Sequence, residues 1–136
     1  MKKVSFIFSL FIFTGIFLLS GCSLKNSPLE KTDSSTTQKA LRTAEKTLES
    51  AKNKNPRAFA KNAYQFRKNR SSHYESYQLL QNVSVPEKAK WTVRKDKQNG
   101  TINVSCPLNR KCRLVIVLKP EKDQTLRFAY ACTLNS

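Results

Sequence analysis

The chain has 136 residues and a formal net charge of +16 at pH 7, with 25 Lys and Arg against nine Asp and Glu. This length corresponds to one domain, and three glycines in the whole chain exclude a glycine-rich phosphate-binding loop. The single histidine has no evident nucleophile partner and the carboxylates are scattered, so we expect no catalytic residues, no cofactor and no enzyme activity.

Residues 1–21 have the features of an export signal. Two lysines precede an apolar run over residues 4–19, and no charge appears again until Lys25. As a helix this run would be about 24 Å long, at 1.5 Å per residue, which is shorter than the roughly 30 Å core of a membrane. The charged start, apolar middle and small residues at the end predict a cleaved signal peptide rather than a permanent membrane helix.

The segment Leu19-Ser20-Gly21-Cys22 resembles the lipobox of bacterial lipoproteins. The resemblance implies cleavage between Gly21 and Cys22, a diacylglyceryl group on the Cys22 thiol, and often a further acyl group on its amine. Two or more acyl chains anchor a protein stably to a membrane. We therefore expect a lipid-anchored membrane protein. Because Ser23 resembles the outer-membrane sorting class, a Gram-negative owner would hold it at the outer membrane, facing the periplasm or the cell surface.

The charge of the exported part predicts its partners. Loss of the two lysines in the signal leaves 23 basic and nine acidic residues, a net charge of +14. Such a charge favours anionic surfaces and polymers. Export makes nucleic acid unlikely as the partner, and leaves anionic envelope ligands or envelope protein complexes.

The exported chain begins with a polar segment and then becomes helical. Residues 22–35 contain the lipidated cysteine and a stretch without periodicity, which predicts a tether. Residues 36–54 predict a helix with a thin apolar face. That face consists of Leu41, Ala44, Leu48 and Ala51.

A second helical segment follows Asn55-Pro56, which suits a helix start because Asn caps well and Pro fits the first turn. Its apolar residues share one helical face: Phe59, Ala63, Phe66, His73 and Tyr77. Arg70 lies inside this apolar stripe, which is a conflict. We therefore expect the helix to break near residue 69. A capping-box pattern that begins at Ser72 predicts that the helix restarts at Ser72. On this face His73 is expected to be a packed core residue rather than a base.

From residue 88 to residue 136 the apolar pattern changes to period two, which predicts a four-stranded antiparallel meander. Asn99-Gly100 is a strong hairpin signal between the first two strands. The meander is expected to pack with the helical segment 36–82 as one small α+β domain.

Three cysteines remain once Cys22 carries lipid. Folding the hairpins about Asn109 and Lys122 places Cys106, Cys112 and Cys132 on one face of the sheet. Cys112–Cys132 is the first candidate for a disulfide, and Cys106–Cys132 and Cys106–Cys112 are the alternatives. No metal site is expected, because a zinc site would need a C-x-x-C pair or a nearby histidine, and the sequence has neither.

The other face of the predicted sheet carries a small apolar strip edged by Arg94, Arg113 and Arg127. Arginine forks suit carboxylates and phosphates, so these three residues are candidates for binding an anion or a partner. The alternative is that helix 36–54 covers the strip.

These features predict a non-catalytic binding or assembly component of the cell envelope. The alternative is a basic periplasmic inhibitor or adaptor that captures an acidic protein or an anionic envelope polymer.

Overall fold

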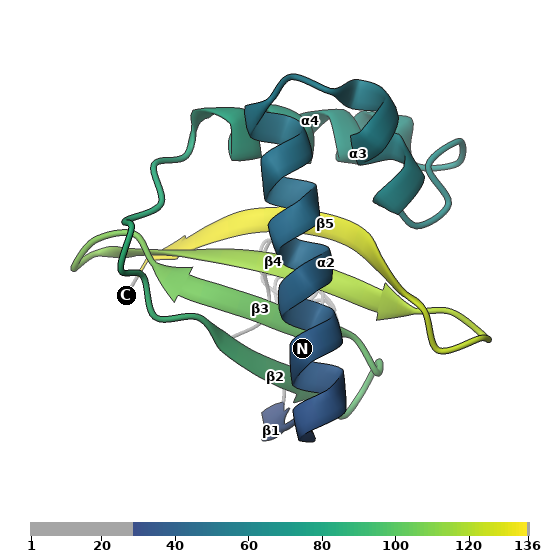
Figure 1. Ribbon diagram of the computed structural model, residues 1–136, viewed down its shortest axis with the longest axis vertical. Helices are drawn as coiled ribbons and strands as arrows, with labels where there is room; N and C mark the ends of the chain where they lie inside the picture. Colours follow the sequence, from purple (N-terminus) through teal and green to yellow (C-terminus); the bar gives the residue numbers. More distant parts are fainter. Residues whose placement is uncertain (1–28, 136) are drawn as a thin grey trace, which may run out of the picture.

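Residues 29–135 are described here from a computed structural model (Figure 1). The predicted signal peptide, the lipobox with Cys22 and the first part of the predicted tether lie outside the described residues. The described part contains three helices and five strands: β1 (Leu29–Lys31), α2 (Ser34–Lys52), α3 (Pro56–Asn62), α4 (Arg70–Asn82), β2 (Thr92–Asp96), β3 (Ile102–Pro107), β4 (Cys112–Pro120) and β5 (Leu126–Asn135).

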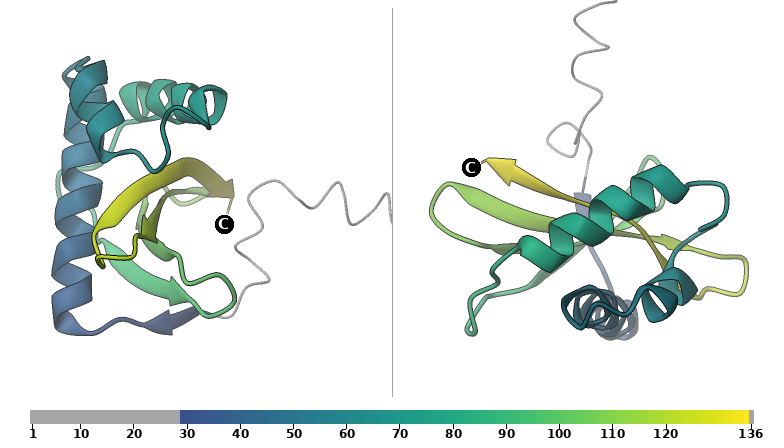
Figure 2. Two further views of the ribbon diagram at one scale, coloured as in Figure 1. Left: turned by 90° about the vertical axis from the view of Figure 1, so that its right-hand side faces the viewer. Right: turned by 90° about the horizontal axis from the view of Figure 1, so that it is seen from above.

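The strands form one antiparallel sheet in the order β1-β2-β3-β4-β5. Helix α2 crosses one face of this sheet, and α3 and α4 pack near β5 (Figures 1 and 2). The α+β class and the meander of four strands are confirmed, and β1 adds a fifth strand at the edge. The core lies between the helices and the helix-facing side of the sheet.

The predicted extent of the tether, residues 22–35, is wrong at its C-terminal end. Leu29 pairs with Asp96, so residues 29–31 belong to the sheet. Asp33 then caps α2, because its carboxylate accepts a hydrogen bond from the amide of Thr36 at 2.7 Å. A strand of three residues is too short to show an alternating pattern in the sequence. It forms by pairing with the edge of β2.

Helix α2 confirms the predicted helix 36–54, with its bounds moved by two residues. Its buried face carries small side chains: Ala40, Ala44, Thr47, Ser50 and Ala51. Small side chains let the helix lie close to the sheet, while the larger Leu41 and Leu48 pack at the edges of the core. The thin apolar face therefore belongs to a helix that lies flat across strands.

The predicted second helix begins as expected but ends early. The Asn55 side chain accepts from the amide of Ala58 at 3.1 Å, and Pro56 occupies the first turn. Helix α3 stops at Asn62 because the chain then turns onto the sheet, where the amide of Tyr64 donates to the carbonyl of Phe128 at 2.7 Å.

The restart at Ser72 is wrong. Helix α4 begins at Arg70 with Asn69 as its N-cap, so Ser72 lies inside the first turn. The predicted stripe still meets in the core, because Phe59 and Ala63 before the break, and His73 after it, are all buried. Tertiary packing thus keeps the stripe together although the helix does not continue.

A β-bulge in β5 changes which side chains face the helices. Leu118 pairs with Phe128, but Val117 pairs with Tyr130, so Ala129 is an extra residue. A bulge of this kind shifts the alternation by one position. Tyr130 and Cys132 therefore lie on the side away from the helices, whereas the predicted register places Cys132 on the same face as Cys106.

The predicted disulfides are wrong. Cys106 and Cys112 are free thiols, so none of the three pairings among Cys106, Cys112 and Cys132 is formed. The register explains this, because Cys106 pairs with Leu114 and Cys112 with Asn135. The centres of both hairpins lie one residue later than predicted, at residues 110 and 123. The bulge also places Cys132 on the opposite face from Cys106.

Candidate anion-binding site

Among residues 29–135, no helix packs on the face of the sheet opposite α2, and we call this face the open face. Helix α2 packs on the side that carries Val93, Val104 and Ile116, so the expectation that it could cover the arginine-edged strip is wrong. The strands direct the following residues to the open face: Thr92, Arg94, Asn103, Ser105, Arg113, Val115, Val117 and Tyr130. Val115 and Val117 form a buried floor in the middle of this face.

A hollow of about 260 Å³ lies on this face, and we call it the open-face hollow. It is lined by Leu29, Thr92, Arg94, Asn103, Ser105, Arg113, Val115 and Leu134. The structure thus brings together two of the three predicted arginines, Arg94 and Arg113. They reach the hollow from different strands, because Arg94 lies in β2 and pairs with Asn103, while Arg113 lies in β4 and pairs with Pro107 and Leu134.

Neither arginine of the hollow has an acidic partner among residues 29–135. Arg94 Nη1 donates to its neighbour's carbonyl, that of Val93, at 3.0 Å, and Arg113 Nη2 donates to Ser105 Oγ at 3.2 Å. Within residues 29–135 the ion pairs join other residues, Lys97 with Glu30 and Arg127 with Glu121. Since each guanidinium carries five N–H donors, Arg94 and Arg113 keep donors for a carboxylate or phosphate.

Asn103 is the most informative residue of the hollow. Its side chain is 5 % exposed, and neither its Nδ2 nor its Oδ1 has a hydrogen-bond partner among the described residues. Leaving a buried polar group without a partner costs roughly 1–3 kcal/mol. A ligand that offers an acceptor to Nδ2 would relieve part of this cost.

Asp96 carries a negative charge on the open face, and Tyr130 lies close enough to be affected by it. Burial raises the pKa of the Tyr130 hydroxyl, and the negative charge of Asp96 raises it further. Asp96 is fully buried, and its Oδ1 accepts from the amide of Gln98 at 2.8 Å while Oδ2 has no partner among the described residues. The positive charge is therefore concentrated at the Arg94 and Arg113 part of the face.

Arg127 does not join the other two arginines. Its Nη1 donates to the carbonyl of Lys61 at 2.5 Å, and its Nε lies 3.5 Å from Glu121. It therefore fastens the end of α3 to the start of β5, and the predicted grouping of Arg127 with Arg94 and Arg113 is wrong. Leu29 and Asn103 were not singled out by the sequence as site residues, and only Asn103, a polar residue between strand valines and isoleucines, carries a signal for this role.

Two further observations concern the chemistry of the described residues. No group of three or more His, Cys, Asp and Glu side chains in residues 29–135 is placed to hold a metal ion. In the same part of the chain, no helix has the length and apolar character that crossing a bilayer requires.

Comparisons with protein-family models, with curated proteins and with solved structures find no match to this chain.

Proposed function

We propose that this chain is a lipid-anchored lipoprotein of the bacterial envelope, a non-catalytic binding or assembly component whose open face binds an anionic group. The observation that carries the proposal is the open-face hollow. It contains Arg94, Arg113 and Asn103. Within residues 29–135 the two arginines have no acidic partner, and the buried amide of Asn103 has no hydrogen-bond partner.

The chemistry of the hollow favours a carboxylate or phosphate attached to an apolar group. Arg94 and Arg113 provide charged donors, and the amide of Asn103 provides a neutral one. Leu29 and Leu134 line the same hollow and supply apolar surface. Acidic envelope polymers, lipid headgroups and acidic protein segments all present such groups.

The proposed anchor would hold this face close to the membrane. Seven residues lead from Cys22 to Leu29, the first described residue. Fully extended, they reach about 25 Å. Since Leu29 itself lines the hollow, a lipid on Cys22 would keep the binding site within a short distance of the bilayer surface.

The anchor is tested by metabolic labelling with palmitate. The wild-type chain is expected to incorporate label and Cys22→Ala to incorporate none, since the lipid would be attached to that thiol. A wild-type chain without label would rule out the lipid anchor.

The binding site is tested with a fluorescent poly-glutamate peptide and the full chain purified in detergent. Arg94→Glu with Arg113→Glu is expected to weaken binding at least tenfold, because two donors of the hollow become repulsive charges. Arg110→Glu with Lys111→Glu is the matched control, since it makes the same charge change on the exposed β3–β4 turn. Equal losses in the two double variants would show that net charge, and not the hollow, binds the peptide.

A further inference from the structure

A second hollow lies at the other end of the domain, between α3 and α4. It has a volume of about 410 Å³, and we call it the aromatic hollow. It is lined by Pro56, Phe59, Phe66, Arg70, Ser71, His73, Tyr74 and Tyr77. Binding pockets for small groups have volumes of about 300–1,000 Å³ and are mostly apolar, so the aromatic hollow has the size and lining of a binding site.

Packed rings fix the floor of the aromatic hollow. Phe59 and Tyr77 meet edge to face with centroids 4.9 Å apart, and Phe66 stacks on His73 at 5.6 Å. Phe59 is 2 % exposed and His73 1 % exposed, whereas Tyr74 at the rim is 61 % exposed. A rigid floor and a free aromatic rim suit a flat or branched apolar group that inserts from outside.

His73 adds an unpartnered polar atom to this lining. Its Nε2 lies 2.8 Å from the carbonyl oxygen of Tyr64, which can only accept, so Nε2 carries the proton. In the neutral ring Nδ1 is then an acceptor, and it has no partner among the described residues. The lining of the aromatic hollow thus includes a buried acceptor whose hydrogen bond is not made within residues 29–135.

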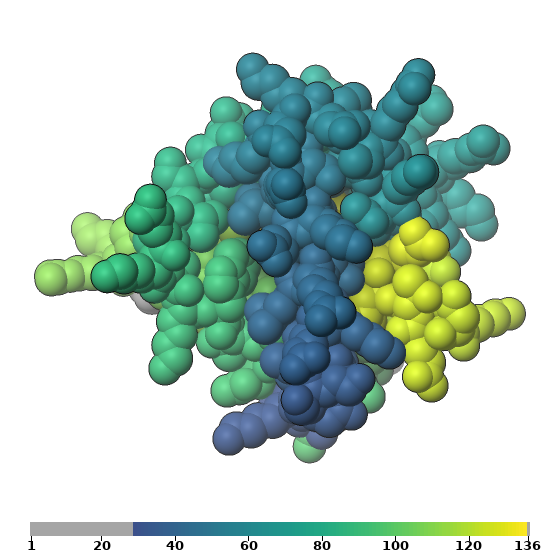
Figure 3. Space-filling view, viewed as in Figure 1, coloured from purple at the N-terminus to yellow at the C-terminus, as the bar shows by residue number. Residues whose placement is uncertain are grey.

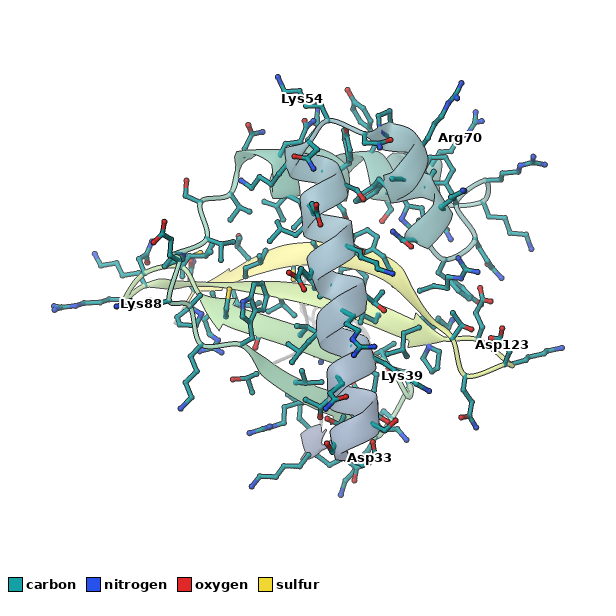
Figure 4. The ribbon with its side chains drawn as sticks, viewed as in Figure 1. Asp33, Lys39, Lys54, Arg70, Lys88 and Asp123 are labelled. Carbon is teal, nitrogen blue, oxygen red and sulfur yellow. The ribbon has the colours of Figure 1, made fainter. Side chains whose placement is uncertain are left out.

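Arg70 lines the aromatic hollow, and the segment that forms most of its lining is basic. Residues 55–74 contain no Asp or Glu, and their five basic side chains are all exposed: Arg57, Lys61, Arg67, Lys68 and Arg70. Figure 4 shows nitrogen-tipped side chains projecting from this end of the molecule, Arg70 among them. None of the five is in an ion pair within residues 29–135. This charge complements an acidic partner.

We propose that the aromatic hollow binds an apolar side chain carried by an acidic segment of a partner protein. This inference goes beyond the anion site, because the two hollows share no lining residue.

The choice of a protein rather than a lipid as the partner rests on the proposed anchor. The 19 residues of α2 span about 28 Å between β1, where the tether would end, and α3 (Figure 1). The aromatic hollow is thus at the end away from the anchor, which favours a partner from the aqueous side.

The surface of the helical layer agrees with this placement. In the space-filling view α2 runs along the middle of the face, and the side chains of the α3–α4 end project beyond it (Figure 3). A partner can reach this end without displacing α2 or any strand.

The experiment uses the full chain in detergent and two fluorescent peptides. Each peptide has glutamates around one central residue, phenylalanine in the first and alanine in the second. The phenylalanine peptide is expected to bind at least tenfold more tightly, and both Arg70→Glu and Tyr74→Ala are expected to remove about tenfold of that affinity. Tyr74→Phe is the matched control and is expected to keep binding, because the ring is retained.

The controls separate this site from the open-face hollow. Arg94→Glu with Arg113→Glu is expected to leave the preference for phenylalanine over alanine unchanged, so failure of one site leaves the other measurable. Equal binding of the two peptides, or unchanged binding in Arg70→Glu and Tyr74→Ala, would overturn the proposal. It would also be overturned if lysophosphatidylglycerol bound with the same dependence on Arg70 and Tyr74 while both peptides bound weakly, because the occupant would then be an anionic lipid.

Discussion

The ring of Phe128 lies edge-on against the ring of Phe59, with centroids 5.1 Å apart and planes at 61°. Phe128 comes from β5 and Phe59 from α3, so this contact joins the sheet to the floor of the aromatic hollow. Phe128 also lies 6.0 Å from the ring of His73 in α4. One buried side chain thus supports both short helices.

Phe128→Ala is expected to lower the free energy of unfolding by roughly 3–5 kcal/mol, because it removes a buried ring and leaves a cavity among Phe59 and His73. Urea denaturation followed by circular dichroism measures the loss. Tyr74→Ala removes an exposed ring from the same region and is expected to change stability by less than about 0.5 kcal/mol. A loss below about 1 kcal/mol in Phe128→Ala would contradict this account of the core.

The cap of α2 gives a stability change with pH. Hydrogen bonds from the backbone and side chain of Thr36 hold the pKa of Asp33 below its ordinary value of 3.8. A carboxyl whose pKa is lower in the folded state stabilises that state above the unfolded value, and the contribution disappears as pH falls through the folded value.

Asp33→Asn keeps an oxygen that can cap the helix and removes the titration. We therefore expect the melting temperature of the wild type to fall more steeply than that of Asp33→Asn as the pH drops below about 4. Asp33→Ala is expected to melt lower than both at neutral pH. Parallel melting curves for the wild type and Asp33→Asn across this pH range would show that the Asp33 charge has no role.

The facing of β2, β3 and β4 was predictable because each of these strands alternates over its core positions. Val93 in β2, Val104 in β3, and Leu114 and Ile116 in β4 face the helices as the pattern predicts. The same alternation predicts that Arg94 and Arg113 share the opposite face, and both line the open-face hollow. The face of each of these residues follows from the two-residue period of a strand, because successive side chains point to opposite faces.

Three features could not be predicted from the pattern. The bulge at Ala129 has no glycine or asparagine that would have predicted it. It places Tyr130 and Cys132 on the opposite face of the sheet. The strand β1 is too short to show alternation. Arg127 does not line the hollow with Arg94 and Arg113, because its side chain donates to the carbonyl of Lys61 in α3. This contact depends on tertiary packing.

Arg70 is the one feature of the sequence that indicates the aromatic hollow. Arg70 interrupts the apolar stripe of Phe66, His73 and Tyr77, which conflicts with a simple buried helix face. In the structure Arg70 stands at the rim of the hollow, at the start of α4. A charged residue within an apolar stripe thus marked a place where the core opens to the surface.

Asn103 links stability to the proposed binding site. Asn103→Val replaces a buried amide that has no hydrogen-bond partner among residues 29–135. The new side chain suits a strand and the paired Val117. We expect the free energy of unfolding to rise by roughly 1–3 kcal/mol, since the unsatisfied amide is removed, and poly-glutamate binding to weaken. Urea denaturation and peptide titration measure the two effects. A less stable variant, or one that binds as tightly as the wild type, would show that Asn103 does not serve the open-face hollow.

The two free thiols are expected to react very differently. Cys106 is fully buried in β3, and burial raises the pKa of its thiol, an effect that the nearby positive charge of Arg113 opposes only in part. Cys112 is partly exposed at the start of β4. The thiolate is the reactive form, so a native chain should alkylate at Cys112 first and at Cys106 only when the sheet opens.

Timed treatment with iodoacetamide, followed by peptide mass spectrometry, measures both rates in one sample. In urea the two rates are expected to converge, because burial no longer protects Cys106. Cys112→Ser is the control, and it should leave the slow rate of Cys106 unchanged, since the two thiols do not form a bridge. If Cys106 reacted as fast as Cys112 in the native chain, the helices would not cover β3 as the structure places them.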